Sequence, residues 1–362
     1  SIYAGKKDYL ASSAPHDYSV SGNKVDLTST KKLMDDFLIK TGEQANEEVA
    51  VSYLLFGIKN QETNKLTVFT KNERKVVPKS IVLVFSQETF KQLTGKELNL
   101  SSNQIALYTK NKTLKTQKSL SIDGKNYQIH RQIGDFINKK VPNIYKIIVS
   151  DYSYLVVPDI KIFESSMKGT SIAQATYVGV NVKDPTHDAK KNLDLLDQIA
   201  GEATKQLAGQ TTGVPESYFS ANSRYDAEGM VNGFVGGTFF IGIFLSIIFM
   251  LGTVLVIYYK QISEGYEDRE RFVILQKIGL DDLQVKQTIR KQVLTVFFLP
   301  LIFAFIHLAF AYHMISLIVR IIGVLNPDLM LVVTIIVCGV FFLAYIMVFV
   351  LTSRSYRRIV SM

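Results

Sequence analysis

The chain has 362 residues, of which 47% are hydrophobic and 20% are charged, with one Cys, no Trp and a formal net charge of +9. The single cysteine, Cys338, excludes an internal disulfide, a cysteine-based zinc site and a C-x-x-C redox pair. The two parts of the chain differ in their content of charged residues. Residues 1–230 contain 30 Lys and Arg and 25 Asp and Glu, whereas the rest of the chain contains 11 and 7. The lysines are scattered and accompany no RNA- or DNA-binding motif, so nucleic acid is not an expected partner.

Residues 1–185 are expected to form a domain of mixed α and β structure. Short runs rich in β-branched and aromatic residues, bounded by turn residues, predict strands. Helical spacing of apolar residues predicts helices at 30–40, at 87–94 before Gly95, and at 187–208. Residues 209–232 are rich in Gly, Ser and Asn and are expected to be an irregular connection. The predicted strands are 49–56, 65–69, 81–85, 104–108, 145–149 and 175–180.

Three uncharged stretches in the second part of the chain are long enough to cross a lipid bilayer. A helix needs about 20 residues to cross a hydrocarbon core about 30 Å thick. Only helices and closed barrels satisfy the backbone in lipid, and these stretches lack the alternation of barrel strands. We therefore expect a membrane α-helical protein with three transmembrane helices and a large α+β domain. The predicted helices are 233–259, 292–319 and 329–353.

The positions of Lys and Arg predict how these helices are oriented. Residues 260–291 carry seven Lys and Arg and the tail 354–362 carries three, whereas the connector 320–328 carries one. Because basic loops stay in the cytoplasm, we expect residues 260–291 and the tail to be cytoplasmic and the connector to be extracellular. The α+β domain, 1–185, and the stalk helix and connection, 186–232, are then expected to be extracellular, in a multi-pass membrane protein.

The sequence offers no constellation for catalysis. It contains no G-x-x-x-x-G-K-[ST] for ATP, no H-E-x-x-H for zinc and no G-x-S-x-G nucleophile elbow. His16, His130 and His187 have no metal-ligand spacing and are expected at the surface. We therefore expect no catalytic residue, no cofactor and no metal, and we do not expect an enzyme.

The segment Asp268–Gly279 is the most informative part of the basic loop. It predicts a short amphipathic helix in which Phe272, Leu275 and Ile278 share one face and Ile274 lies beside it. Gly279 is expected to end that helix in a left-handed conformation. Asp281 then caps a second helix, with Gln284 completing a capping box. The resulting cytoplasmic elbow, 260–291, suits a groove on a partner protein or, equally, the lipid surface.

These residues resemble a known family. The segment Glu267–Ile289 is similar to the loop of FtsX-like (MacB-type) ABC transporter permeases, in which a charged cluster and an I-L-x-x-x-G core precede a short helix. Tyr258–Arg269 resembles the BceB-type permeases of bacitracin and antimicrobial-peptide resistance. In that family seven spans precede the outside domain, so the resemblance implies the C-terminal portion of such a permease. The matching residues are Arg269, Glu270, Ile274, Leu275 and Gly279.

The resemblance implies a permease subunit in a bacterial cell membrane that senses and resists cell-wall-active antimicrobial peptides, with ATP hydrolysed by a separate ABC ATPase dimer. Its implied partners are that ATPase, a sensor histidine kinase, membrane lipid, and a peptide antibiotic or lipid-linked cell-wall precursor. The alternative is an FtsX-type membrane regulator that activates a cell-wall hydrolase. The residues implied to couple to the ATPase are Arg269, Glu270 and Arg271 as polar contacts, with Phe272, Ile274, Leu275, Ile278 and Gly279 shaping the helix.

Overall fold

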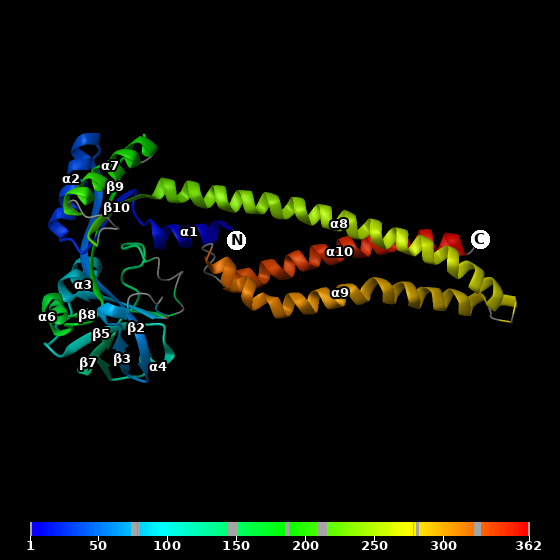
Figure 1. Cartoon of the computed structure of the whole chain (residues 1–362), viewed down its shortest axis with the longest axis horizontal. Helices are drawn as coiled ribbons and strands as arrows, with labels where there is room; N and C mark the ends of the chain where they lie inside the picture. Colours follow the sequence, from blue (N-terminus) through cyan, green and yellow to red (C-terminus); the bar gives the residue numbers. More distant parts are fainter. Residues whose placement is uncertain are drawn as a thin grey trace. The chain divides into compact units, whose positions relative to one another are not determined.

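The computed structural model contains two compact units, which we call the sheet unit, Tyr3–Val231, and the helix unit, Asn232–Met362 together with Ser1–Ile2. The sheet unit contains all of the described strands, and the helix unit contains most of three long helices (Figure 1). The structure describes residues 2–73, 78, 80–143, 149, 151–184, 188–208, 216–277, 279, 282–321 and 327–360.

The strands of the sheet unit are β1 (Tyr18–Asn23), β2 (Ala45–Glu62), β3 (Lys65–Val68), β4 (Ser80–Ser86), β5 (Gln104–Thr109), β6 (Ser119–Ile122), β7 (Lys125–Gln132), β8 (Asp151–Val157), β9 (Ile172–Val182) and β10 (Tyr218–Ser223). They form one sheet in the order β10-β1-β9-β2-β3-β6-β7-β5-β8-β4. Because β2 also pairs with β4, the seven strands from β2 to β4 close into a ring. Strands β9, β1 and β10 extend from the first half of β2.

The long strand β2 belongs to both parts of the sheet. Successive side chains of a strand point to opposite faces, so residues of odd and even number enter different cores. Val51 and Tyr53 join a cluster on the outer face, while Leu54, Phe56 and Ile58 join the cluster that fills the ring. Ile105, Leu107 and Leu155 complete that filling from the opposite strands and are fully buried. The ring is therefore a packed core.

Helices cover the sheet and have well-defined ends. They are α1 (Ile2–Ser13), α2 (Leu27–Thr41), α3 (Gln87–Thr94), α4 (Lys112–Lys115), α6 (Ile160–Ser166) and α7 (Ala189–Ala208), with a short 3-10 turn at Lys71–Glu73. Asp26 caps α2 by accepting from the Ser29 backbone N–H, and Gly42 ends it at a φ of 72°. Ser86 and Gly95 do the same for α3. Helices α2 and α7 share an apolar core with β1, β9 and β10.

Most of the predicted elements of this unit are confirmed. The helices at 30–40, 87–94 and 187–208 correspond to α2, α3 and α7, and five predicted strands correspond to β2, β3, β4, β5 and β9. The sixth, 145–149, lies outside the described residues except for Val149, which is in no strand. The prediction of an irregular connection at 209–232 is wrong over 218–231, where β10 leads directly into a helix; 209–215 lie outside the described residues.

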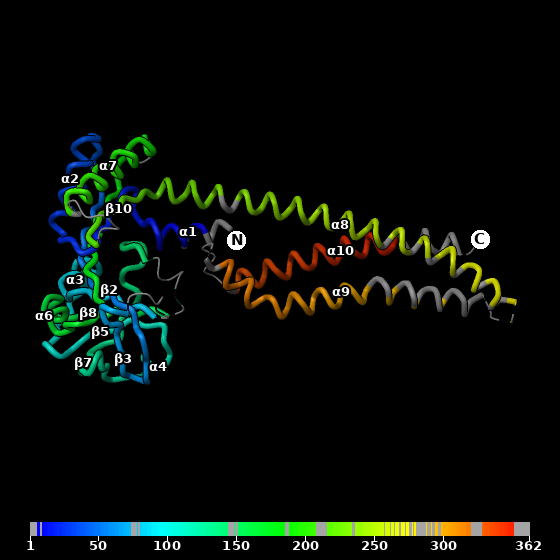
Figure 2. The backbone as a smooth tube through the Cα atoms, in the orientation of Figure 1, coloured from blue at the N-terminus to red at the C-terminus, as the bar shows by residue number. Residues whose placement is uncertain are grey.

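Three helices are long and apolar enough to cross a membrane by length and composition. They are α8 (Arg224–Lys277), α9 (Asp282–Ile321) and α10 (Pro327–Val360), and Figure 2 traces the chain from β10 into α8. Their apolar windows have no residue buried within the structure. Ring contacts join the last two, between Phe298 and Phe349 and between Phe305 and Phe342. The three predicted membrane helices are thus each contained in one observed helix.

The predicted elbow differs from the structure. Residues 260–277 form no separate amphipathic helix, because α8 continues through them from Arg224 without a break for 54 residues, or about 81 Å. The physical reason is that this stretch is made mostly of good helix formers, and its one glycine, Gly265, costs only about 1 kcal/mol. The predicted cap Asp281 lies outside the described residues, and α9 begins at Asp282.

The packed ring predicts a clear difference between two isoleucines. Ile105 is fully buried inside it, whereas Ile39 on α2 is 78% exposed. Ile105→Ala is expected to lower the unfolding free energy of the sheet unit by about 2–5 kcal/mol, through lost burial and a residual cavity. Ile39→Ala is expected to change it by less than about 0.5 kcal/mol. Urea unfolding of the chain in detergent, followed by near-ultraviolet circular dichroism, measures both. Equal effects would contradict the packed-ring description.

Candidate functional site

The predicted coupling residues lie at the far end of α8. Arg269, Glu270 and Arg271 are exposed there, and the side chain of Ile274 is 58% exposed. Phe272 and Leu275 belong to α8, but their side chains lie outside the described residues, and so does Ile278. Gly279 has a φ of 106°, in the left-handed region that the sequence predicts for it. The role of these residues remains a prediction.

This end of α8 and the start of α9 form a helical hairpin that reverses the chain near Gly279. An exposed apolar side chain among Arg and Glu side chains is suited to contact with a partner protein. Ile274 and Val273, which is 43% exposed, are the described apolar residues of this kind. Among the described residues, the hairpin thus presents exposed apolar and charged side chains next to one another.

A second candidate site is the junction at which α8 leaves the sheet. Strand β10 ends at Ser223 and α8 begins at Arg224, with no intervening residue. The Arg224 backbone N–H donates to the Asp17 carbonyl oxygen at 3.1 Å, and its Nε donates to the Ala14 carbonyl oxygen at 3.3 Å. These bonds fix the first turn of α8 against the segment between α1 and β1.

The carboxylate of Asp17 is the centre of this junction. Asp17 as a whole residue is buried, with 5% of its surface exposed. One oxygen accepts a hydrogen bond from the Val182 backbone N–H at 3.0 Å, and the other lies 3.5 Å from Nη1 of Arg224. The Asp17 backbone N–H in turn donates to the side-chain oxygen of Asn181 at 3.1 Å. A single residue thereby joins β1, β9 and α8.

A buried histidine lies next to this carboxylate. His16 is 2% exposed, and its Nδ1 is 2.7 Å from the hydroxyl oxygen of the fully buried Tyr177. Burial lowers the pKa of His16 from 6.5 to about 4, despite the opposing effect of Glu47. A Cβ atom on Gly179 would overlap the His16 ring and the Tyr177 hydroxyl oxygen, so glycine is required there. The prediction of a surface position is wrong for His16; it holds for His130, and His187 lies outside the described residues.

Helix α1 is attached to the same junction. Lys6 on α1 forms an ion pair with Glu228 on α8, one turn beyond Arg224. At its other end, the Ser12 carbonyl oxygen accepts from the Asn143 backbone N–H. Sequence reasoning missed this whole arrangement. The polar residues His16, Asp17 and Ser19 lie among the buried residues 14–20, and their sequence gives no sign of this burial.

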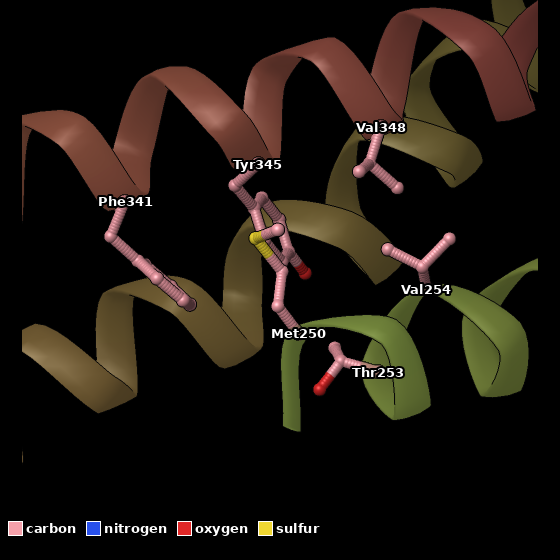
Figure 3. Close-up of a pocket in the computed structure, with 6 residues that line it drawn as sticks. All are labelled: Met250, Thr253, Val254, Phe341, Tyr345 and Val348. Carbon is pink, nitrogen blue, oxygen red and sulfur yellow. The ribbon is translucent and has the colours of Figure 1, made fainter. Parts of the chain in front are cut away.

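A small apolar cleft lies between α8 and α10 in the helix unit. Met250, Thr253 and Val254 approach it from α8, and three residues approach from α10 (Figure 3). Its lining is almost entirely hydrocarbon, so it offers packing contacts and no polar recognition. No group of three or more His, Cys, Asp or Glu able to hold a metal occurs among the described residues. The residues from α10 are Phe341, Tyr345 and Val348.

Comparison with known proteins finds transport proteins of Bacillus subtilis (strain 168). The chain is 36% identical over 72 residues to the ABC transporter permease protein YxdM, covering 20% of this chain and 12% of that protein. It is 29% identical over 140 residues to the bacitracin export permease protein BceB, covering 39% and 19%. The chain has local homology to ABC transporter permeases. It also matches the uncharacterized ABC transporter permease YvcS at 29% identity over 121 residues, covering 33% and 18%.

The homology covers only part of this chain and only part of each relative. The matches cover less than a fifth of the length of each of these permeases, and no family model matches the chain. Among solved structures, a crystal structure of a putative lipoprotein from Bacillus anthracis matches 48% of this chain and 92% of that one. The identity is 14% and the TM-score is 0.27, too low to carry an argument.

The junction predicts a graded effect of substitutions at Asp17. Asp17→Ala is expected to lower the unfolding free energy by about 2–3 kcal/mol, because the Val182 N–H and the Arg224 guanidinium lose their buried acceptor. Asp17→Asn keeps an acceptor oxygen and is expected to cost about 1 kcal/mol. Lys6→Gln removes a partly exposed pair and is expected to cost less than about 1 kcal/mol. Urea unfolding measures the series, and a cost for Lys6→Gln equal to that of Asp17→Ala would contradict it.

His16 predicts a dependence of stability on pH. Its pKa is 6.5 when unfolded and about 4 when folded, so between these values only the unfolded state takes up the proton. The stabilising contribution is complete above pH 6.5 and is lost as the pH falls towards 4, by roughly 3 kcal/mol in total. The unfolding free energy of His16→Gln is expected to change less than that of the wild-type chain between pH 6.5 and pH 5. If the unfolding free energies of the two proteins changed equally with pH, His16 would not be the group that titrates in this way.

Proposed function

We propose that the chain is part of an ABC transporter permease of the BceB type, which resists and senses cell-wall-active antimicrobial peptides. The proposal extends the local homology to ABC permeases, one of which is named for bacitracin export. The resemblance of Glu267–Ile289 to FtsX-like permeases supports the same assignment. No observation specifically favours a regulator of cell-wall hydrolases.

One structural observation carries the mechanism. Helix α8 starts at the sheet and runs unbroken through an apolar window to the exposed Arg269–Ile274 end. A helix of this kind is stiff, because every interior residue adds to a continuous hydrogen-bonded ladder. In the proposed function, the α8–α9 hairpin contacts a separate ATPase in the cytoplasm and the sheet unit faces the outside. A movement of the ATPase then reaches the sheet unit along α8.

The charge distribution supports this orientation. The segment 260–291 carries seven Lys and Arg, and the sequence predicts that such a loop remains cytoplasmic. A separate ATPase is proposed because the similar proteins are named as permease components of ABC transporters. A histidine kinase, and a peptide or lipid-linked cell-wall precursor bound outside, complete the proposal. Membrane lipid would surround the apolar windows of α8, α9 and α10.

The coupling role is tested by placing a charge on the exposed hairpin. Ile274→Asp is expected to reduce copurification of the proposed ABC ATPase partner by at least tenfold, because a carboxylate must be desolvated in the contact. Ile39→Asp introduces the same change at an exposed isoleucine of the sheet unit and is expected to leave copurification unchanged. Both variants should reach the membrane in normal amounts. Normal copurification with Ile274→Asp would exclude the proposed contact.

A further inference from the structure

The first residue of α8 is held by the segment 14–17, which joins α1 to β1. The Nε of Arg224 donates to the Ala14 carbonyl oxygen, and its backbone N–H donates to the Asp17 carbonyl oxygen. Its Nη1 lies 3.5 Å from one oxygen of the Asp17 carboxylate, while the other oxygen accepts from the Val182 backbone N–H on β9. A displacement of the segment 14–17 would therefore separate the first turn of α8 from β9.

The ring of His16 fixes this segment against β9. Nδ1 of the ring lies 2.7 Å from the hydroxyl oxygen of Tyr177, and the centres of the two rings are 5.7 Å apart. A Cβ atom on Gly179 would lie 2.4 Å from the same nitrogen, so the ring is in close contact with the backbone of β9. His16 is 2% exposed, and a positive charge on its ring would have no access to water.

The titratable groups that face His16 do not compensate for such a charge. Glu47 on β2 attracts it, but this residue is exposed and its carboxylate accepts from a side-chain amide at 3.0 Å. Arg224 on α8 repels it. Asp17 already accepts from a backbone N–H and lies beside the Arg224 guanidinium, and Tyr177 stays neutral because burial raises the pKa of its hydroxyl. Burial is the largest effect on the His16 ring and lowers its pKa from 6.5 to about 4.

We propose that His16 is an acid-sensitive latch, in which a proton on the ring releases the segment 14–17 from β9 while the rest of the sheet unit stays folded. The charged ring is hydrated only after it leaves its position against β9. Because Asp17 follows His16 directly in the chain, this displacement also withdraws the carboxylate from Val182. The first turn of α8 then remains joined to the sheet through β10 and loses its contact with β9.

The release is confined to the junction, because the larger cores of the sheet unit do not titrate in this range. The cluster that fills the ring of strands consists of apolar side chains, including Ile105 and Leu155. The cluster shared by α2, α7 and β9 is apolar apart from the Tyr18 hydroxyl, and burial raises the pKa of that group. A change from pH 7 to pH 5 therefore leaves these contacts in place. The inference concerns the sheet unit and does not depend on the transport role.

Amide hydrogen exchange of the full chain in detergent, with residue-level fragmentation, tests the latch. The reporters are the backbone N–H groups of Val182 and Asp17, which bond across the contact between the segment 14–17 and β9. The control is the Ile129 N–H, which donates to a carbonyl oxygen in the ring of strands at 2.9 Å. After correction for intrinsic exchange rates, the opening constant of the reporters is expected to rise about 20-fold from pH 7 to pH 5, because the released ring has a pKa of 6.5 and the bound ring one of about 4. The opening constant of Ile129 is expected to stay within about threefold.

Two histidine variants identify the titrating group. His16→Gln keeps a hydrogen-bonding side chain without the titration, and its reporters are expected to change less than about threefold between the two pH values. His130→Gln removes an exposed histidine of the same unit and is expected to keep the full rise. Near-ultraviolet circular dichroism at pH 7 establishes that both variants are folded.

Three results would overturn the proposal. An unchanged opening constant at Val182 and Asp17 in the wild-type chain would show that acid does not release the segment. An equal rise at Ile129 would show that acid unfolds the unit as a whole. An equal rise in His16→Gln would assign the titration to another group. The comparison of reporter and control amides in the wild-type chain decides the proposal even if His16→Gln does not fold.

Discussion

One buried carboxylate holds the first turn of α8 against the sheet. Asp17 accepts a hydrogen bond from Val182 on β9 and lies 3.5 Å from the guanidinium of Arg224, the first residue of α8. Because a buried carboxylate is costly without such partners, the three elements are held in one arrangement. The packing of His16 against Gly179 and the pair between Lys6 and Glu228 extend the same junction. The sheet unit therefore includes the first turns of α8 as a fixed part.

The second constraint is the membrane. A backbone in lipid has to satisfy its own hydrogen bonds, and α8, α9 and α10 do so over windows long enough to cross a bilayer. Helix α8 has no break between Arg224, whose guanidinium lies 3.5 Å from the Asp17 carboxylate, and Lys277. The proposed coupling to an ATPase rests on this continuity, and the local homology to ABC permeases gives it a biochemical context.

The sequence predicted helices correctly where one local physical feature determines the structure. Long uncharged stretches predicted the three helices, and Ser86 with Gly95 bounded α3 correctly, because caps and breakers act locally. The long helix through 260–277 was missed because charged residues suggested a new element, although they are also good helix formers. The burial of His16 and the strand β10 were not predictable, since each depends on pairings between residues far apart in the chain.

The proposed function requires the sheet unit and the α8–α9 hairpin to lie on opposite sides of a membrane. Labelling of single cysteines in intact cells tests it directly, in a Cys338→Ser background that leaves no other thiol. Ile39→Cys on exposed α2 should react with a membrane-impermeant maleimide in intact cells, whereas Lys277→Cys at the end of α8 should react only after lysis. Reaction of both cysteines, or of neither, before lysis would contradict the account.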